Sequence, residues 1–172
     1  GASVSRALNN RPGVSEALRE RVRQRARELN YTPSITARGL ATSQTFSIGF
    51  FVSEKPGLTT QSDPYYGKIL HGIEQTCADT DYHISIATLT QAVFEAPASF
   101  RFVKERRVDG MILAGPDIPV TFVQQMLASG IPLVLVDNPV TDLSVSSVNS
   151  DDMAGAYAAA QHLLELGHQK IG

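Results

Sequence analysis

The stretch Phe46-Ser47-Ile48-Gly49-Phe50-Phe51-Val52 is short and almost entirely apolar, which is typical of a strand buried on both faces of a sheet. From this stretch onward, similar runs alternate with segments whose apolar residues recur every three or four positions, as on one face of a helix. This alternation predicts an α/β fold, a mostly parallel, doubly wound sheet with helices on both faces. We expect further strands at 83–89, 108–113, 132–136 and 145–148, and helices at 63–77, 94–106, 120–128 and 152–166.

A doubly wound parallel sheet binds ligands in the loops beyond the carboxyl ends of its strands. The expected strands therefore place candidate small-molecule loops at 53–63, 114–117 and 137–142. Topology alone supports these three loops, and it does not identify the ligand.

The first 44 residues have a different pattern, which is helix, turn, helix. Ser3 can cap a short helix, and the breaker cluster at 9–13 ends it. A longer helix is expected to begin at Ser15. Residues 34–41 have helical spacing but form barely two turns, so we expect this helix to become ordered only against a partner. The longer helix is expected to bury an apolar stripe made of Leu18, Val22, Ala26 and Leu29.

The charge is divided in the same way as the pattern. The whole chain of 172 residues has a formal net charge of -2, but residues 1–44 carry eight arginines against three acids, a net of +5. Residues 45–172 carry seven cations against 14 acids, a net of -7. Only the first segment is therefore expected to be drawn to phosphate. The alternative for most of these arginines is a solvated helix face, balanced in part by Glu16, Glu20 and Glu28.

The sequence gives no sign of an enzyme or a metal site. It has no G-x-S-x-G, P-loop, H-E-x-x-H, C-x-x-C or glycine-rich dinucleotide pattern, and its four histidines have no metal-ligand spacing. Cys77 is the single cysteine, which excludes an internal disulfide framework. No run of about 18 apolar residues occurs, so we expect no membrane span and a soluble protein of the cytoplasm. We predict no cofactor.

Several motifs along the chain, taken together with their order and spacing, resemble the lactose repressor / galactose repressor (LacI/GalR) family of bacterial transcription regulators over nearly the full length. The motifs are Ser3-Val4-Ser5-Arg6-Ala7-Leu8-Asn9, Val14-Ser15, Glu28-Leu29-Asn30-Tyr31-Thr32-Pro33, Ala37-Arg38-Gly39-Leu40, Asp63-Pro64-Tyr65-Tyr66, Gly72-Ile73-Glu74, Val108-Asp109-Gly110-Met111-Ile112, Ile131-Pro132-Leu133-Val134-Leu135-Val136-Asp137, Val148-Asn149-Ser150-Asp151 and His162-Leu163-Leu164-Glu165-Leu166-Gly167-His168.

The resemblance implies a partial helix-turn-helix headpiece and hinge helix at 1–44. It implies that residues 45–172 are the N-terminal lobe of a periplasmic-binding-protein-like effector and dimerisation domain. It also implies truncation at both ends, because the first headpiece helix and the C-terminal lobe are absent from the sequence.

The resemblance places the first helix in the major groove of DNA. Arg6 is the best candidate for reading bases, because its guanidinium can bond O6 and N7 of guanine together, worth about 1–3 kcal/mol of discrimination. Leu40 matches the hinge leucine that wedges into the minor groove; the alternative is a linker residue that docks on the body. For Val4 and Leu8 we favour packing inside the headpiece. The implied DNA-contacting residues are Gly1, Ala2, Ser3, Ser5, Arg6, Asn9, Ser15, Tyr31, Ser34, Ala37, Arg38 and Leu40.

The resemblance also implies a sugar or sugar-phosphate effector in the acidic body. Tyr65 and Tyr66 would stack on the apolar face of a sugar ring, and Asp137 would accept hydrogen bonds from its hydroxyls. Tyr66 has the alternative of a helix-core residue, and Asp151 that of a helix N-cap. The implied ligand residues are Ser53, Asp63, Tyr65, Tyr66, Asp137, Asn149 and Asp151.

The favoured hypothesis is a repressor of carbohydrate metabolism genes that binds a palindromic double-stranded operator as a homodimer. In this hypothesis the effector alters operator affinity through the hinge helices. The alternative is a soluble solute-binding module whose basic N-terminal segment has no specific DNA target. An enzyme of the doubly wound class is a more distant third.

Overall fold

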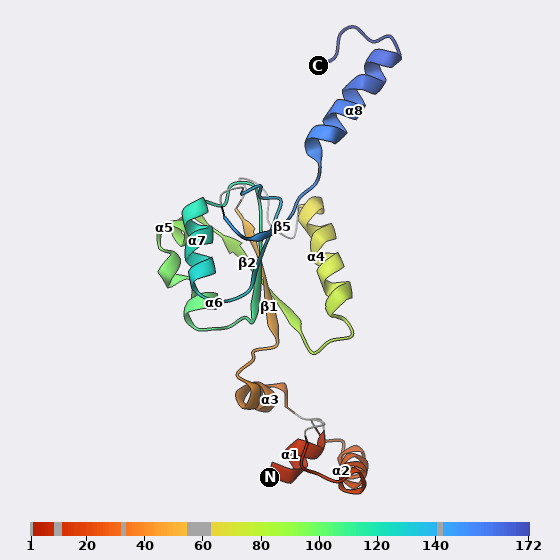
Figure 1. The fold of residues 1–172 in the computed structure, drawn as a ribbon, viewed down its shortest axis with the longest axis vertical. Coiled ribbons are helices and arrows are strands. Elements are labelled where there is room, and N and C mark those ends of the chain that lie inside the picture. The colour runs from red at the N-terminus through yellow and green to blue at the C-terminus, as the bar shows by residue number, and fades with distance from the viewer. Residues whose placement is uncertain (1, 9–11, 32–33, 55–62, 141–142) are drawn as a thin grey trace. The chain divides into compact units, whose positions relative to one another are not determined.

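The computed structural model describes residues 2–8, 12–31, 34–54, 63–140 and 143–172. They fall into two compact units, residues 1–45 and 46–172 (Figure 1). Each unit is described by itself below.

The first unit contains three helices, α1 (Ala2–Leu8), α2 (Glu16–Glu28) and α3 (Ile35–Thr42). Helix α2 begins where the sequence predicts, because the side chain of Ser15 accepts a hydrogen bond from the N–H of Leu18 at 3.3 Å. The expectation of a buried stripe on α2 is wrong. No residue of α2 is buried and Leu29, which follows it, is 66% exposed, because its partner α1 is only seven residues long and covers little of it.

The second unit is built on a parallel sheet of five strands in the order β2-β1-β3-β4-β5. The strands are β1 (Ser47–Ser53), β2 (His83–Leu89), β3 (Gly110–Ala114), β4 (Leu133–Val136) and β5 (Ser146–Val148). The predicted parallel α/β sheet is confirmed, and the observed strand bounds differ from the expected ones by up to two residues.

Helices cover both faces of this sheet, as the period-3.6 segments predict (Figure 1). Helix α4 (Pro64–Cys77) packs on one face, where Tyr66 joins Phe50, Val52 and Ala114 in a small core. Helix α7 (Val120–Ala128) and its neighbours pack on the other face over a larger core that includes Phe51, Phe122 and Leu135. Adjacent β1 residues point to opposite faces, so the run at 46–52 is buried on both sides.

The single helix expected at 94–106 is wrong. The chain there forms α5 (Gln91–Glu95), a 3₁₀ turn, η1 (Pro97–Ser99), and α6 (Arg101–Lys104). Pro97 has no N–H to donate and disfavours a helical conformation at the residue before it, so α5 ends just before it.

The last helix, α8 (Asp152–Glu165), follows β5 as predicted. Its side chains are exposed except for Leu163, which is half-buried; Met153, at 85%, and Tyr157, at 70%, are among the most exposed. Among the described helices, none has the length and apolar character needed to cross a membrane.

Candidate functional site

The parallel strands of the second unit all end at one edge of the sheet, and most of the predicted ligand residues lie there. Ser53 is the last residue of β1, Asp137 directly follows β4, and Asn149 directly follows β5. Asp63 and Tyr65 belong to the start of α4, which the chain enters after leaving β1. The structure therefore brings together residues that are far apart in sequence.

Asp137 and Tyr66 form the central contact of this edge. The Tyr66 hydroxyl donates a hydrogen bond to Oδ2 of Asp137 at 3.1 Å, and Tyr66 is only 1% exposed. Burial, followed by the hydrogen bond to Asp137 and its charge, raises the pKa of Tyr66 well above its ordinary value. Tyr66 therefore stays a protonated donor, and Asp137 keeps acceptor sites for a ligand hydroxyl.

The backbone also fixes the position of Asp137. Its φ of 55° lies in the left-handed region, and its N–H donates to the carbonyl of Val148 at 3.0 Å. This bond ties the end of β4 to the end of β5 and holds the Asp137 side chain over the strand ends.

Asn138 is a residue of this edge that the sequence analysis missed. It is 2% exposed, and its side-chain amide donates to the carbonyls of Gly115 at 2.8 Å and Pro116 at 3.3 Å. Its own N–H donates to the side-chain oxygen of Asn149 at 3.0 Å. Asn138 therefore joins the loops after β3, β4 and β5. An asparagine directly after the strand-ending Asp137 was the available signal.

Ser53 is a predicted ligand residue whose side chain is buried beneath the strand ends. Its hydroxyl is buried and makes no hydrogen bond with any described group, and a Cβ added at Gly115 would lie 1.9 Å from it. Gly115 has a φ of 130°, which only glycine adopts without strain. The Ser53 hydroxyl therefore packs against Gly115 in the loop after β3, and its role in ligand binding stays a prediction.

Two of the predicted ligand carboxylates act as helix caps. Asp63 Oδ1 accepts from the N–H of Tyr65 at 2.9 Å, and Asp151 Oδ1 accepts from the N–H of Ala154 at 3.0 Å. The N-cap alternative given for Asp151 therefore describes what its side chain does here. Tyr65 is 44% exposed and meets Tyr66 edge to face, with ring centroids 5.1 Å apart.

A groove of about 870 Å³ runs along the α4 face of the sheet, next to this edge. It is lined mainly by apolar side chains, including Ile69, Ile112 and Val134, while Tyr65 and Asn149 lie in its lining as well. A polyol needs several hydrogen-bonding partners. The strand-end cluster around Asp137 therefore suits a sugar better than the apolar length of the groove.

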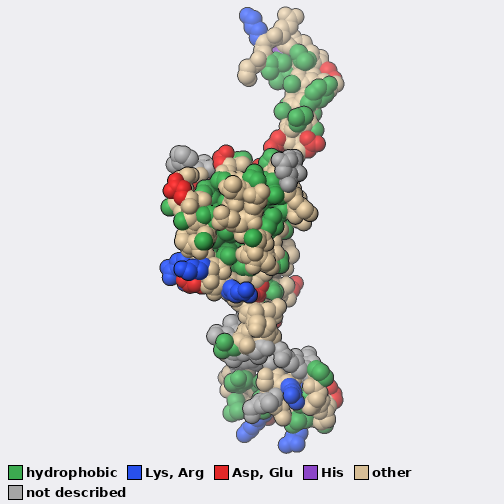
Figure 2. Space-filling model, turned by 60° about the vertical axis from the view of Figure 1, so that its left-hand side comes forward, with side chains coloured by type: hydrophobic (Ala, Val, Ile, Leu, Met, Phe, Trp, Pro, Cys, Tyr) green, Lys and Arg blue, Asp and Glu red, His purple; other side chains and the backbone are tan. Residues whose placement is uncertain are grey.

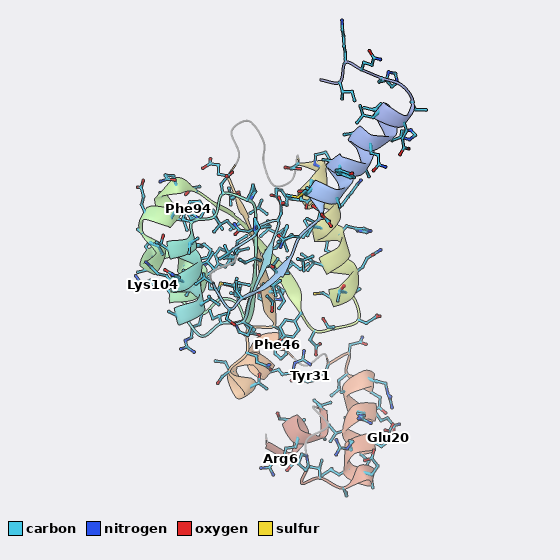
Figure 3. The ribbon with its side chains drawn as sticks, turned by 45° about the horizontal axis from the view of Figure 1, so that its top comes forward. Arg6, Glu20, Tyr31, Phe46, Phe94 and Lys104 are labelled. Atoms are coloured by element: carbon cyan, nitrogen blue, oxygen red, sulfur yellow. The ribbon has the colours of Figure 1, made fainter. Side chains whose placement is uncertain are left out.

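The first unit presents most of its predicted DNA residues to solvent. Ser3 and Ser5 on α1 are exposed, and so is Arg6 (Figure 3), whereas Ala7 is fully buried. Val4, which was expected to pack inside the headpiece, is 46% exposed. The described structure gives only the backbone of Ala2, and the predictions for Gly1 and Asn9 lie outside the described residues.

The arginines of α2 are largely balanced within their own helix. Ion pairs join Arg19 to Glu16 at 3.2 Å and Arg27 to Glu20 at 2.9 Å. Arg25 pairs with Glu28 at 2.6 Å, and Arg23 pairs with Glu20 at 3.8 Å. The structure thus favours the solvated-face interpretation for Arg25 and Arg27, whose side chains are 71% and 68% exposed, whereas the side chain of Arg19 is only 13% exposed.

Helix α3 exposes the predicted wedge. Leu40 is 83% exposed, and the close turn behind it depends on Gly39, whose added Cβ would lie 2.5 Å from the carbonyl oxygen of Gln44. Of the other predicted residues, Tyr31 and Ser34 are exposed and Arg38 is half-buried. For Ala37 only the backbone is described. Within the described part of the chain, no three His, Cys, Asp or Glu side chains group as metal ligands.

Comparison with known families gives two matches, one for each of the two units of the chain. The family of periplasmic binding proteins and sugar binding domain of LacI family matches residues 46–172, and the bacterial regulatory proteins, lacI family, match residues 2–34. The chain belongs to the LacI family. The partial helix-turn-helix and the lobe of a sensor domain, both implied by the resemblance, are therefore confirmed.

Among LacI-family relatives, the chain is 32% identical over 171 residues to the ribose operon repressor of Haemophilus influenzae, covering 99% of this chain and 49% of that protein. It is 29% identical over 171 residues to the transcriptional repressor CytR of Escherichia coli, covering 99% and 48%. The chain thus spans about half the length of the curated relatives it matches.

Solved LacI-family structures have the same fold. A lac repressor dimer bound to operator and the anti-inducer ONPF matches with a TM-score of 0.76 at 24% identity, covering 99% of this chain and 50% of that one. The transcriptional regulator CelR in complex with cellobiose matches with a TM-score of 0.62 at 27% identity, covering 99% and 50%.

Proposed function

We propose that the complete protein is a sequence-specific DNA-binding repressor of carbohydrate metabolism genes, whose operator affinity is set by a sugar or sugar-phosphate effector. The observation that carries this proposal is that one LacI-family chain contains both an exposed Arg6 on α1 and, in its other unit, the Tyr66–Asp137 hydrogen bond at the strand ends. The two sites have the chemistry of two different ligands. Curated relatives named as repressors of the ribose operon and as CytR support the same assignment.

Arg6 supplies sequence readout in this proposal. Arg6 is exposed, and its guanidinium lies beside Gly13, where an added Cβ would be in ordinary contact with Nη1 at 3.5 Å. Ser3 and Ser5 on the same helix offer hydroxyls to phosphate oxygens, which position the helix without reading bases.

Leu40 supplies the minor-groove wedge. An exposed leucine on a helix of eight residues is unfavourable in water unless it finds an apolar partner, and an unstacked base step is such a partner. The kink costs a few kcal/mol, which the added contacts between protein and DNA offset.

The strand-end cluster supplies the effector site. Asp137 accepts hydrogen bonds from sugar hydroxyls, the exposed ring of Tyr65 stacks on the sugar, and Asn149 offers amide groups beside them. The named complex of CelR with cellobiose supports an effector of this class. Ser53, Asp63 and Asp151 support the loops around it.

Coupling between the sites follows from linkage. If the effector binds one arrangement of the complete sensor domain more tightly, it shifts the hinge helices of a homodimer and changes its affinity for a palindromic operator. The operator then changes the affinity for the effector by the same factor. The protein would act in the bacterial cytoplasm, where the operator is. No catalytic step is required.

The test uses the full-length protein and a palindromic duplex that it selects from a random pool. Fluorescence anisotropy measures affinity with and without a panel of sugars and sugar phosphates, for wild type and for Leu40→Ala. We expect one sugar class to change affinity severalfold and Leu40→Ala to weaken binding. If no duplex is selected, the protein is a solute-binding module; if no sugar acts and Leu40→Ala binds normally, the coupling scheme is wrong.

A further inference from the structure

The second unit has a compact basic patch although it is acidic as a whole. Four of the seven Lys and Arg residues in 45–172 lie within residues 101–107, and the single acid among them is Glu105. Figure 2 shows Lys and Arg gathered at one end of this unit, with Asp and Glu both beside them and at the opposite end. We name this set the basic patch; its members are Arg101, Lys104, Arg106 and Arg107.

Two cations of the basic patch are available to an outside anion. Glu105 pairs with Arg101 at 3.2 Å and with Arg107, and both hydrogen bonds lower the pKa of its carboxyl. Lys104 and Arg106 are exposed, and neither makes an ion pair with a carboxylate in the described part of the chain. These two side chains therefore carry uncompensated positive charge.

The backbone holds Arg106 in a position that glycine normally occupies. Helix α6 ends in two closing bonds, Arg106 N–H to the carbonyl of Val103 at 3.1 Å and Arg107 N–H to the carbonyl of Phe102 at 2.9 Å. The residue at this point of the motif is left-handed, and Arg106 has a φ of 49°. An arginine is strained there and a glycine is not, so packing of α6 does not explain the arginine.

The basic patch lies at the edge of the sheet where β1 begins. The segment after the patch is bonded to that strand, because Asp109 N–H donates to the carbonyl of Ser47 and Phe46 N–H donates to Oδ2 of Asp109, both at 2.8 Å. Only four residues, 43–46, connect α3 to β1, which is at most roughly 18 Å of extended chain. The basic patch therefore lies at the edge of the sheet to which this short linker attaches.

We propose that Lys104 and Arg106 contact phosphates of the DNA backbone, so that the sensor unit itself adds a second, sequence-independent DNA-binding surface. This inference rests on the proposed function and extends it. Lys and Arg suit phosphate oxygens, and such contacts position the protein and strengthen binding without reading sequence.

The test measures the affinity of full-length protein for its selected duplex between about 50 and 200 mM salt. Each phosphate contact contributes about 0.9 to the slope of log affinity against log salt. The double variant Lys104→Ala with Arg106→Gly should lower this slope by about 1.8 per chain. Across that salt range each chain should account for about a tenfold smaller loss of affinity than in wild type. Thermal unfolding should be unchanged or improved, because glycine suits the position of Arg106.

The matched control removes the same charge elsewhere. Lys68 and Lys170 are exposed and lie outside the basic patch, so Lys68→Ala with Lys170→Ala should leave the slope unchanged. Glu105→Gln should steepen the slope, because it releases Arg101 and Arg107. The inference is wrong if the patch variant keeps the wild-type slope, or if the control variant lowers it equally.

Arg6→Ala separates this result from the proposed function. If Arg6→Ala weakens binding while the patch variant keeps the wild-type slope, the proposed function stands and the second surface does not. If the full-length protein binds no duplex, both fail.

Discussion

The two predicted sites of this protein are built in opposite ways. At the strand ends of the second unit, Tyr66 and Asn138 are buried and bonded to Asp137 and to loop carbonyls. In the first unit, Arg6 is exposed and Leu40 is 83% exposed. A small ligand is recognised by groups that the fold has already ordered, whereas a DNA surface supplies the missing partners itself. The comparison predicts that mutations at the strand ends of the second unit affect stability, and that mutations at the exposed residues of the first unit affect binding alone.

The largest effect is expected for Gly115→Ala. The new Cβ would collide with the Ser53 hydroxyl and the backbone would be strained, which together should lower the free energy of unfolding by about 3–5 kcal/mol. Urea unfolding measures this. Gly130→Ala is the control: it has a φ of 74° but open space around it, so it should cost only about 1 kcal/mol. Equal losses would show that the contact with Ser53 is unimportant.

Asn138→Ala should rank second. It leaves the buried carbonyl of Gly115 without its donor and should lower the free energy of unfolding by about 2–3 kcal/mol. Isothermal titration of the full-length protein should also show weaker sugar binding, because the three loops lose their link. If the variant is as stable as wild type and binds sugar with normal affinity, Asn138 does not belong to the effector site.

Arg6→Ala should show the opposite behaviour. Arg6 is exposed, so the free energy of unfolding should change by less than about 0.5 kcal/mol, while operator affinity falls by about 1–3 kcal/mol. Anisotropy and thermal unfolding of the same sample measure both quantities. A loss of stability as large as the loss of affinity would contradict the contrast between the two sites.

Tyr66→Phe should have the smallest effect, about 1 kcal/mol, because water can replace the hydroxyl at the half-buried Asp137. The pH dependence is more specific. The pKa of Tyr66 is raised by folding, so its contribution to stability is present below about pH 10 and is lost as the pH rises further. Urea midpoints from pH 8 to 11 should fall for wild type and stay flatter for Tyr66→Phe. Parallel curves would contradict this.

Local patterns in the sequence predicted the ends of α2, α4 and α8 well, but Ser3, expected to cap the first helix, lies inside α1. Ser15 and Asp63 cap α2 and α4, and Gly167 follows α8, because capping depends on neighbouring residues alone. The buried stripe of α2 was predicted wrongly, since periodicity marks an apolar face but not whether another element covers it. Pro97 itself signalled a break in the helix expected at 94–106, but the helical spacing of the apolar residues around it led to a single helix being predicted.

The sequence by itself determined the alternating elements, the division of charge, and the family through its motifs, because each depends on residue type and on spacing along the chain. Only the tertiary structure decided that Tyr66 bonds Asp137, 71 residues away, that Asn138 links three loops, and that the basic patch lies beside the start of β1. Strand order and register set these distances, and they come from the packing of the whole sheet.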